Sequence, residues 1–211
     1  MKSYLQKKNK PEIRLCVFAA SLIVCLSCVS KAPSQMTVIR PEKPQSPRNI
    51  LGKGLTSRET LGAFLLDFNQ SANKTDVYNL AGIYIEESAI EGVNHDVAFS
   101  QMCLETGFLR FGGLVTPDMN NFCGLGSTGP GQKGLYFPSA EIGVRAHIQH
   151  LKGYASTAPL QRPLVDPRYR YVKYGIAPDI YELAGRWATD KEYGNKIATI
   201  LDRLYDFAFP N

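Results

Sequence analysis

The chain has 211 residues, of which 44% are hydrophobic and 20% are charged, a composition typical of one globular domain with extensions. Its formal net charge of +5 is unevenly distributed, because residues 1–28 carry +4, residues 29–58 carry +5 and residues 59–211 carry −4. Since the basic excess lies outside the globular part, we expect no nucleic-acid-binding surface on the domain.

The first 28 residues have the pattern of a secretory signal. An apolar run over residues 15–26 follows a group of basic side chains, Lys7, Lys8, Lys10 and Arg14. The run is too short for a comfortable membrane span, although an uncleaved anchor is an alternative. We therefore expect a protein that is exported to the cell envelope.

Cys28 is a candidate for lipidation. The sequence Cys25-Leu-Ser-Cys28 partly resembles the lipobox of bacterial lipoproteins, in which the cysteine after a small residue receives the lipid. Ser27 fits this pattern, whereas Cys25 stands where the pattern has Leu. We expect a lipoprotein anchored to the membrane through Cys28, with soluble secretion as the alternative.

Residues 29–55 are predicted to form a linker. They are rich in proline and serine and have almost no apolar periodicity, so they cannot bury a core. Their basic side chains could lie along anionic lipid or wall polymer. A solvated spacer explains the same composition and is the favoured interpretation.

Periodic apolar residues predict helices from residue 56 onward. The sequence Thr56-Ser-Arg-Glu59 matches a capping box and marks the start of an amphipathic helix. A second helix is predicted to end near residue 91, and its Glu86, Glu87 and Glu91 are most simply placed facing water.

Four more helices are predicted further along the chain. Asn94 is expected to cap a central helix and Ser139 to cap the next one. The last two are predicted at about residues 179–187 and 193–207. Strand signals are weak, so the predicted fold class is all-α with at most a small β-hairpin, and residues 56–211 form one domain.

The central helix contains the first candidate catalytic residue. Its sequence, Val97 to Phe108, is apolar on nearly every face, as expected of a helix buried on all sides. Gly107 suits the left-handed turn that ends a helix, which places Glu105 in the last turn. The helix dipole and apolar surroundings both disfavour the carboxylate, so we expect a raised pKa, as a general acid requires.

Two long segments lack helical periodicity. Residues 112–134 contain seven glycines and two prolines and are predicted to form a loop or a short irregular hairpin next to Glu105. Residues 152–178 also form a predicted loop, and loops of this length in compact domains are often functional. Tyr169, Tyr171 and Tyr174 make it aromatic, which suits sugar stacking as well as ordinary packing.

Cysteines and histidines do not define a further site. Outside the signal only Cys103 and Cys123 remain, and either a disulfide or two free thiols is compatible with the sequence. His147 and His150 have a spacing at which they could share a metal, but no third ligand is evident. We therefore expect no metal site and no cofactor.

Four sequence blocks together resemble the bacterial glucosaminidase domain of glycoside hydrolase family 73, a lysozyme-like peptidoglycan hydrolase. They occur in the order of the family and span roughly residues 56–209. The blocks are Glu91 to Phe108, ending in Glu-Thr-Gly-Phe; Asn120-Asn-Phe-Cys-Gly-Leu-Gly126; Phe137 to Leu151; and Trp187-Ala-Thr-Asp-Lys-Glu-Tyr-Gly-Asn-Lys-Ile197.

The resemblance implies a lysozyme-like fold with a cleft and assigns roles to individual residues. The catalytic acid of the family falls on Glu105, which the helix pattern also singles out, and its active-site tyrosine falls on Tyr193. The residues expected to line the sugar groove are Gln101, Asn121, Phe122 and Gly124. The structural alternatives are that Tyr193 only packs on the core and that Asn121 only shapes an Asn-rich turn.

One departure from the family pattern affects the mechanism. Many members have a second glutamate in a hairpin before the helix capped by Ser139, but residues 124–140 contain no carboxylate. Asp118 and Glu141 flank this segment without matching a motif position. A single acid assisted by the N-acetyl group of the substrate, or by a water held by Tyr193, fits these residues better than two carboxylates.

The sequence thus predicts an envelope-located endo-β-N-acetylglucosaminidase that cleaves β-1,4 bonds in peptidoglycan strands. The alternatives are a muramidase or lytic transglycosylase on the same fold, and a wall-binding domain without turnover. Inverting and retaining outcomes are not separated by the sequence.

Overall fold

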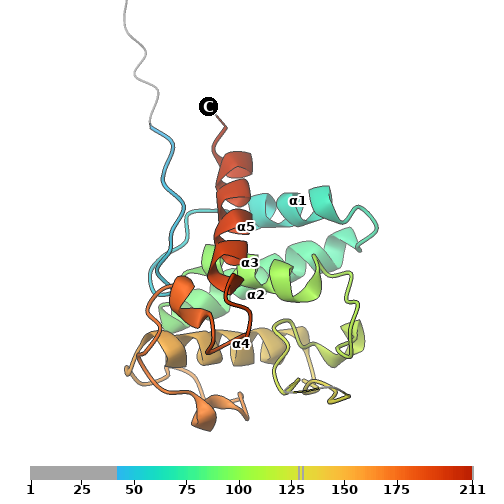
Figure 1. Ribbon diagram of the computed structural model, residues 1–211. Helices are drawn as coiled ribbons and strands as arrows, with labels where there is room; N and C mark the ends of the chain where they lie inside the picture. The colour runs from blue at the N-terminus through green and yellow to red at the C-terminus, as the bar shows by residue number, and fades with distance from the viewer. Residues whose placement is uncertain (1–41, 128, 130, 211) are drawn as a thin grey trace, which may run out of the picture. The chain divides into compact units, whose positions relative to one another are not determined.

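The computed structural model describes residues 42–127, 129 and 131–210, and Figure 1 shows their arrangement. Within these residues the chain is all-α, and its few isolated β-bridges form no sheet. The α-helices are α1 (Arg58–Phe68), α2 (Lys74–Glu91), α3 (His95–Thr106), α4 (Ala140–Ala155) and α5 (Tyr193–Ala208). The 3-10 turns are η1 (Pro117–Met119), η2 (Tyr169–Tyr171) and η3 (Tyr181–Leu183).

The predicted fold class is confirmed, but one predicted helix is wrong. The helix expected at residues 179–187 is reduced to the single turn η3. Ala184 leaves that turn with an extended backbone (ψ 129°), and Gly185 then adopts a left-handed conformation (φ 74°). The chain is thereby redirected before Trp187, which reaches the site described below.

Helix α3 is the buried centre of the domain, as its apolar sequence predicts. Asn94 caps it, since its side-chain oxygen accepts from the backbone N–H groups of Asp96 and Val97. Helices α2, α4 and α5 all pack against α3, and Figure 1 shows α5 crossing it. Phe99 and Met102 are completely buried. This position gives the end of α3 a rigid support.

Two glutamates of α2 are buried, so the prediction that they face water is wrong. Glu87 accepts two hydrogen bonds from Arg145 of α4, at 2.9 and 3.0 Å. Glu91 accepts from Lys152 at 2.7 Å. Only Glu86 is exposed, as expected. The partners lie on a helix about 60 residues further along, which is why the local pattern of α2 does not show them.

Residues 42–55, assigned to the linker from the sequence, lie against the helical domain. Ile50 is completely buried, its N–H donates to Pro178 and its carbonyl accepts from Asn94. Arg48 also bonds to Asp202 of α5 at 2.7 Å. The folded unit therefore begins before residue 56. The predicted signal, the predicted lipidation site Cys28 and the first part of the predicted linker lie outside the described residues.

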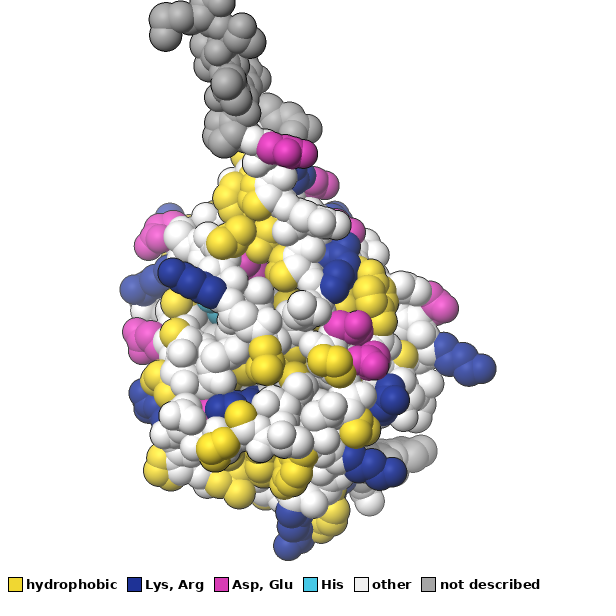
Figure 2. Space-filling model, turned by 90° about the vertical axis from the view of Figure 1, so that its left-hand side faces the viewer, with side chains coloured by type: hydrophobic (Ala, Val, Ile, Leu, Met, Phe, Trp, Pro, Cys, Tyr) yellow, Lys and Arg dark blue, Asp and Glu magenta, His cyan; other side chains and the backbone are white. Residues whose placement is uncertain are grey.

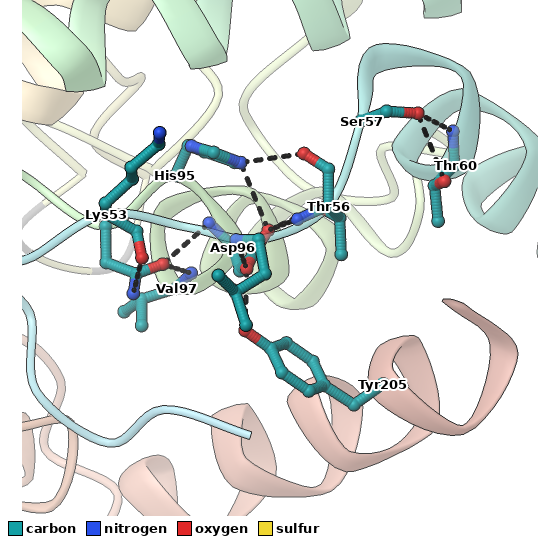
Figure 3. Close-up of polar contacts among 10 residues, drawn as sticks. Lys53, Thr56, Ser57, Thr60, His95, Asp96, Val97 and Tyr205 are labelled. Atoms are coloured by element: carbon teal, nitrogen blue, oxygen red, sulfur yellow. Dashed lines mark hydrogen bonds and ion pairs between the residues drawn. The ribbon is translucent and has the colours of Figure 1, made fainter. Parts of the chain in front are cut away.

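A buried carboxylate fastens this N-terminal segment to the helices (Figure 3). Asp96 of α3 accepts from the N–H of Leu55 and from the hydroxyl of Tyr205 on α5, both at 2.8 Å, and also from the hydroxyl of Thr56. Thr56 is therefore not the cap of α1. That position belongs to Ser57, whose side chain accepts from the N–H of Thr60.

Among the described residues, no helix combines the length and apolar character that crossing a membrane requires.

Candidate active site

Glu105 lies in the last turn of α3, where the sequence places it. Gly107 ends the helix in a left-handed conformation (φ 56°), and its N–H bonds to the carbonyl of Leu104. The next turn is unusual, because Phe108, Leu109 and Phe111 have positive φ without being glycine. Such strained positions cluster at functional sites.

Surrounding contacts hold this strained turn in place. The carbonyl of Phe108 accepts from Asn69 at 2.8 Å, and its ring stacks on Phe68 at 4.3 Å. Thr106 accepts from the N–H of Leu109 at 2.9 Å. The chain is thereby directed from α3 into the wall of a cleft beside Glu105.

The cleft has a volume of about 740 Å³, within the range of small-molecule sites. One wall is the glycine-rich segment after α3 and the other comes from the turn before α5. Its lining includes Glu105, Gly112, Asn121, Gly124, Trp187 and Thr189. Glu105 is the only carboxylate among the described residues that line it.

The two oxygens of Glu105 have different surroundings. Oε1 accepts hydrogen bonds from the hydroxyl of Tyr193 and from the indole N–H of Trp187, the latter at 3.1 Å. Among the described residues no donor bonds to Oε2, and a Cβ added at Gly124 would lie 3.5 Å from it. In the protonated acid the proton therefore sits on Oε2, beside the cleft.

Burial raises the pKa of Glu105, as predicted from the helix pattern. The hydrogen bonds from Tyr193 and Trp187 favour the carboxylate and oppose this rise, but burial prevails. The residue is thus suited to hold a proton at a pH where an exposed glutamate has lost it.

A row of buried polar side chains extends behind Tyr193. Gln101 Nε2 donates to the Tyr193 hydroxyl at 2.8 Å, and Gln101 Oε1 lies 3.0 Å from His147 Nε2. His147 Nδ1 is 2.9 Å from the hydroxyl of Tyr84. These contacts join α2, α4, α3 and α5 to the acid.

The charge state of His147 fixes the direction of these bonds. Burial, aided by His150, lowers the pKa of His147 to about 3, so its ring is neutral. Its Nε2–H then donates to Gln101, and Nδ1 accepts from Tyr84. Because the oxygen of Tyr193 accepts from Gln101, its own proton points to Glu105. The row therefore orients the acid.

The predicted sugar-groove residues have different positions in the structure. Gln101 is completely buried, with both ends of its amide engaged. Asn121 is 1% exposed, and its amide holds the glycine-rich loop through the backbone of Leu125 and Leu135. The geometry therefore supports structural roles for both, although Asn121 touches the cleft wall.

Phe122 packs into the core and lines a different hollow, whereas Gly124 lies on the cleft wall beside Glu105. Direct sugar contact therefore stays a prediction for Gly124 and is not supported for Phe122.

Neither flanking carboxylate reaches the cleft. Asp118 accepts from the hydroxyl of Thr116 at 2.6 Å, on the exposed turn η1. Glu141 pairs with Arg145 at 2.5 Å on α4. The cleft thus offers no second carboxylate from these residues.

The two cysteines of the domain are free thiols, and both are buried. Burial raises the pKa of both, so neither is a reactive thiolate. His147 and His150 turn to different partners, since His150 bonds to Asp166 at 2.6 Å. The described residues hold no cluster of three side chains suited to a metal ion.

Sequence reasoning missed Trp187, His147 and Tyr84. Trp187 is the only tryptophan of the chain and begins the last motif block, so its position was a usable signal. His147 and Tyr84 lie on the buried sides of α4 and α2, where their contacts depend on residues far away in the sequence. Only the three-dimensional arrangement shows that both belong to the row of hydrogen-bonded side chains behind Tyr193.

A helical domain whose central helix ends in a partly buried acid at the wall of a cleft defines the lysozyme-like class. A family model described as mannosyl-glycoprotein endo-beta-N-acetylglucosaminidase matches residues 81–206, which include Glu105 and Tyr193. The chain belongs to this glucosaminidase family, glycoside hydrolase family 73.

A protein of Borreliella burgdorferi is 44% identical over 158 residues, which are 75% of this chain and 78% of that protein. Its name states no activity. Family membership supports a function of the peptidoglycan-hydrolase type and a location outside the cytoplasm or in the envelope.

Proposed function

We propose that the protein is an endo-β-N-acetylglucosaminidase that cleaves the β-1,4 glycan strands of peptidoglycan. The observation that carries this proposal is the asymmetry of Glu105, whose Oε1 is held by two donors while Oε2 lies beside Gly124, a residue of the cleft wall. This arrangement presents a proton to a bound glycosidic oxygen. The family supplies the substrate class.

In the proposed reaction Glu105 Oε2 donates its proton to the glycosidic oxygen. The bond from that oxygen to the anomeric carbon breaks, and the leaving sugar departs with the proton as a new hydroxyl group. The positive charge that develops on the anomeric carbon requires an electron-rich partner. Glu105, now ionised, accepts a proton from the water that completes the hydrolysis.

The second catalytic element is proposed to come from the substrate. The lining residues supply no second carboxylate, and the hydroxyl of Tyr193 is engaged between Gln101 and Glu105. The N-acetyl carbonyl of the sugar can attack the anomeric carbon from the opposite face and form a cyclic intermediate that water then opens. Tyr193 is accordingly proposed to position the acid rather than the water.

Digestion of purified peptidoglycan with the full chain tests this function. Mass spectrometry of the released fragments is expected to show reducing N-acetylglucosamine ends. Reducing N-acetylmuramic acid ends would indicate a muramidase, and anhydro-muramic ends a lytic transglycosylase. Binding of peptidoglycan without release of fragments would instead indicate a wall-binding domain.

The role of Tyr193 can be tested by Tyr193→Phe, which keeps the ring and removes the hydroxyl. The lost donor favours the carboxylate of Glu105, so its removal is expected to raise the pKa of Glu105 further. Because catalysis needs the protonated acid, the alkaline limb of the pH–kcat/KM profile should move to higher pH. A uniform loss of rate with an unmoved limb would assign the hydroxyl to the substrate or water instead.

We further propose that the protein is a lipoprotein anchored through Cys28. The envelope location of a wall hydrolase and the partial lipobox support this, and Cys28→Ala should move the protein out of the membrane fraction or block its processing. Cell fractionation and the mass of the mature protein provide the measurement. Ser27→Ala, which keeps a small residue before the cysteine, serves as the control. Unchanged fractionation and mass in Cys28→Ala would exclude lipidation.

A further inference from the structure

A smaller pocket of about 220 Å³ adjoins the catalytic cleft. The two spaces share Cys123, Gly124, Ser127 and Trp187, so they meet at the loop that faces Glu105. The remaining wall of the pocket comes from Leu125 and Gly126 of the same loop, from α4 and from the segments that follow α4. A group bound there would belong to a ligand that also occupies the cleft.

Two arginines line this pocket without an acidic partner. Among the described residues, no carboxylate forms an ion pair with Arg168 or Arg186. Both guanidinium groups act on Tyr154, where they oppose the rise in its pKa that burial causes. Both arginines line the same pocket as Tyr154, and the guanidinium group of Arg186 also donates to the backbone carbonyl of Glu182 at 2.7 Å.

Tyr171 provides a platform for one of these arginines. Its ring is 58% exposed and lies 4.7 Å from the guanidinium carbon of Arg168. A guanidinium stacked on an aromatic ring is partly preorganised, and its planar set of donors matches a carboxylate. The pocket thus offers a partly preorganised donor group at its wall.

Basic side chains are concentrated in the segment after α4, which supplies part of the pocket wall. Residues 59–211 carry 13 basic and 17 acidic side chains, yet residues 156–178 carry four basic side chains and one acidic one. The single acid, Asp166, is buried and bonded to His150. Figure 1 shows segment 156–178, in orange, below α4, and Figure 2 shows dark blue and hydrophobic side chains with little magenta on the lower part of its face.

We propose that this pocket binds a carboxylate carried by the substrate strand, next to the bond that is cleaved. The inference rests on the proposed function and adds a subsite to it. Peptidoglycan offers such groups in two places, on the peptides attached to the muramic acid and on the lactyl group where the peptide is missing. Arg168 and Arg186 provide paired donors for either one.

Binding measurements on the Glu105→Gln chain test the subsite independently of turnover. Three soluble ligands are compared: glycan oligomers with peptides, the same oligomers stripped of peptides, and chitin oligomers, which carry no carboxylate. Replacing both Arg168 and Arg186 by Gln is expected to weaken binding of a carboxylate ligand about tenfold and to leave chitin binding unchanged. Arg170→Gln is a matched control, because Arg170 lies 4.7 Å from the same Tyr171 ring but does not line the pocket.

Each outcome decides the inference. Weaker binding of only the peptide-bearing oligomers assigns the pocket to peptide carboxylates, and weaker binding of the stripped oligomers assigns it to the lactyl group. Equal weakening of all three ligands, or of none, overturns the inference. Failure of the proposed function is distinct, because the wild-type chain would then release no fragments, or only fragments with muramic ends, even where the arginine variants lose binding.

Discussion

Glu105→Gln is expected to abolish cleavage of peptidoglycan while the domain folds normally. General acid catalysis typically contributes about 10²–10⁴-fold, so a loss of that order is expected in the release of reducing ends. The amide retains the shape of the side chain, and its oxygen can still accept from Tyr193 and Trp187. Only the proton facing the cleft is lost. A loss smaller than tenfold would count against the assignment.

The stability of this variant separates catalysis from folding. The pKa of Glu105 is raised by burial, so its contribution to stability is complete below the pKa of the unfolded chain and is lost as pH rises through the folded pKa. The neutral amide does not suffer that loss. The unfolding midpoint of Glu105→Gln at neutral pH should therefore be no lower than that of the wild type.

Asp118→Asn is the matched control for this substitution. Asp118 lies in the long loop that follows α3. It is exposed and does not line the cleft. It should retain most of the activity, as should Glu141→Gln on α4. If either control were as inactive as Glu105→Gln, a two-carboxylate mechanism would replace the one proposed.

The acid could be predicted because its signals are local in sequence. The apolar faces of α3, the cap at Asn94 and the terminating Gly107 all lie within 14 residues, and together they place Glu105 at a buried helix end. The same kind of local pattern predicts α2, α4 and α5. The motif resemblance adds Tyr193, whose hydroxyl the structure does bring to Glu105.

The partners of the acid could not be predicted, because they depend on long-range packing. Tyr193 is 88 residues from Glu105, and Gln101 bonds to His147 across 46 residues. No local pattern distinguishes an amide that contacts a sugar from one that orients a tyrosine. The sequence therefore identifies Gln101 as a site residue, while its contacts with Tyr193 and His147 lead us to propose a positioning role in place of the expected substrate-binding one.

The charges of α2 also depend on long-range packing, although Glu87 and Glu91 have the spacing of a solvated face. Their partners Arg145 and Lys152 lie on α4, so the two ion pairs join α2 to α4 inside the domain. Glu91 also accepts from the backbone N–H groups of Gln161 and Arg162. The buried pair thereby anchors the segment that carries the arginine pocket.

Lys152→Met is accordingly expected to be among the most destabilising single substitutions in the domain. The side chains of Lys152 and Glu91 are 5% and 0% exposed, so the substitution leaves a buried carboxylate without its cation. Breaking such a pair from one side costs about 3–5 kcal/mol, which urea unfolding at neutral pH can measure. The methionine keeps the length of the lysine stem, so loss of packing contributes little.

Two further variants identify the unpaired charge as the cause. Adding Glu91→Gln to Lys152→Met removes the charge while its amide oxygen can still accept from the backbone, and it should restore most of the lost stability. Lys196→Met breaks an exposed pair with Asp190, whose side chains are 55% and 40% exposed, and should cost much less stability than Lys152→Met. If Lys152→Met were no more destabilising than Lys196→Met, the buried pair would not anchor the loop. If the double variant stayed as unstable as Lys152→Met, lost packing rather than the unpaired charge of Glu91 would explain the effect.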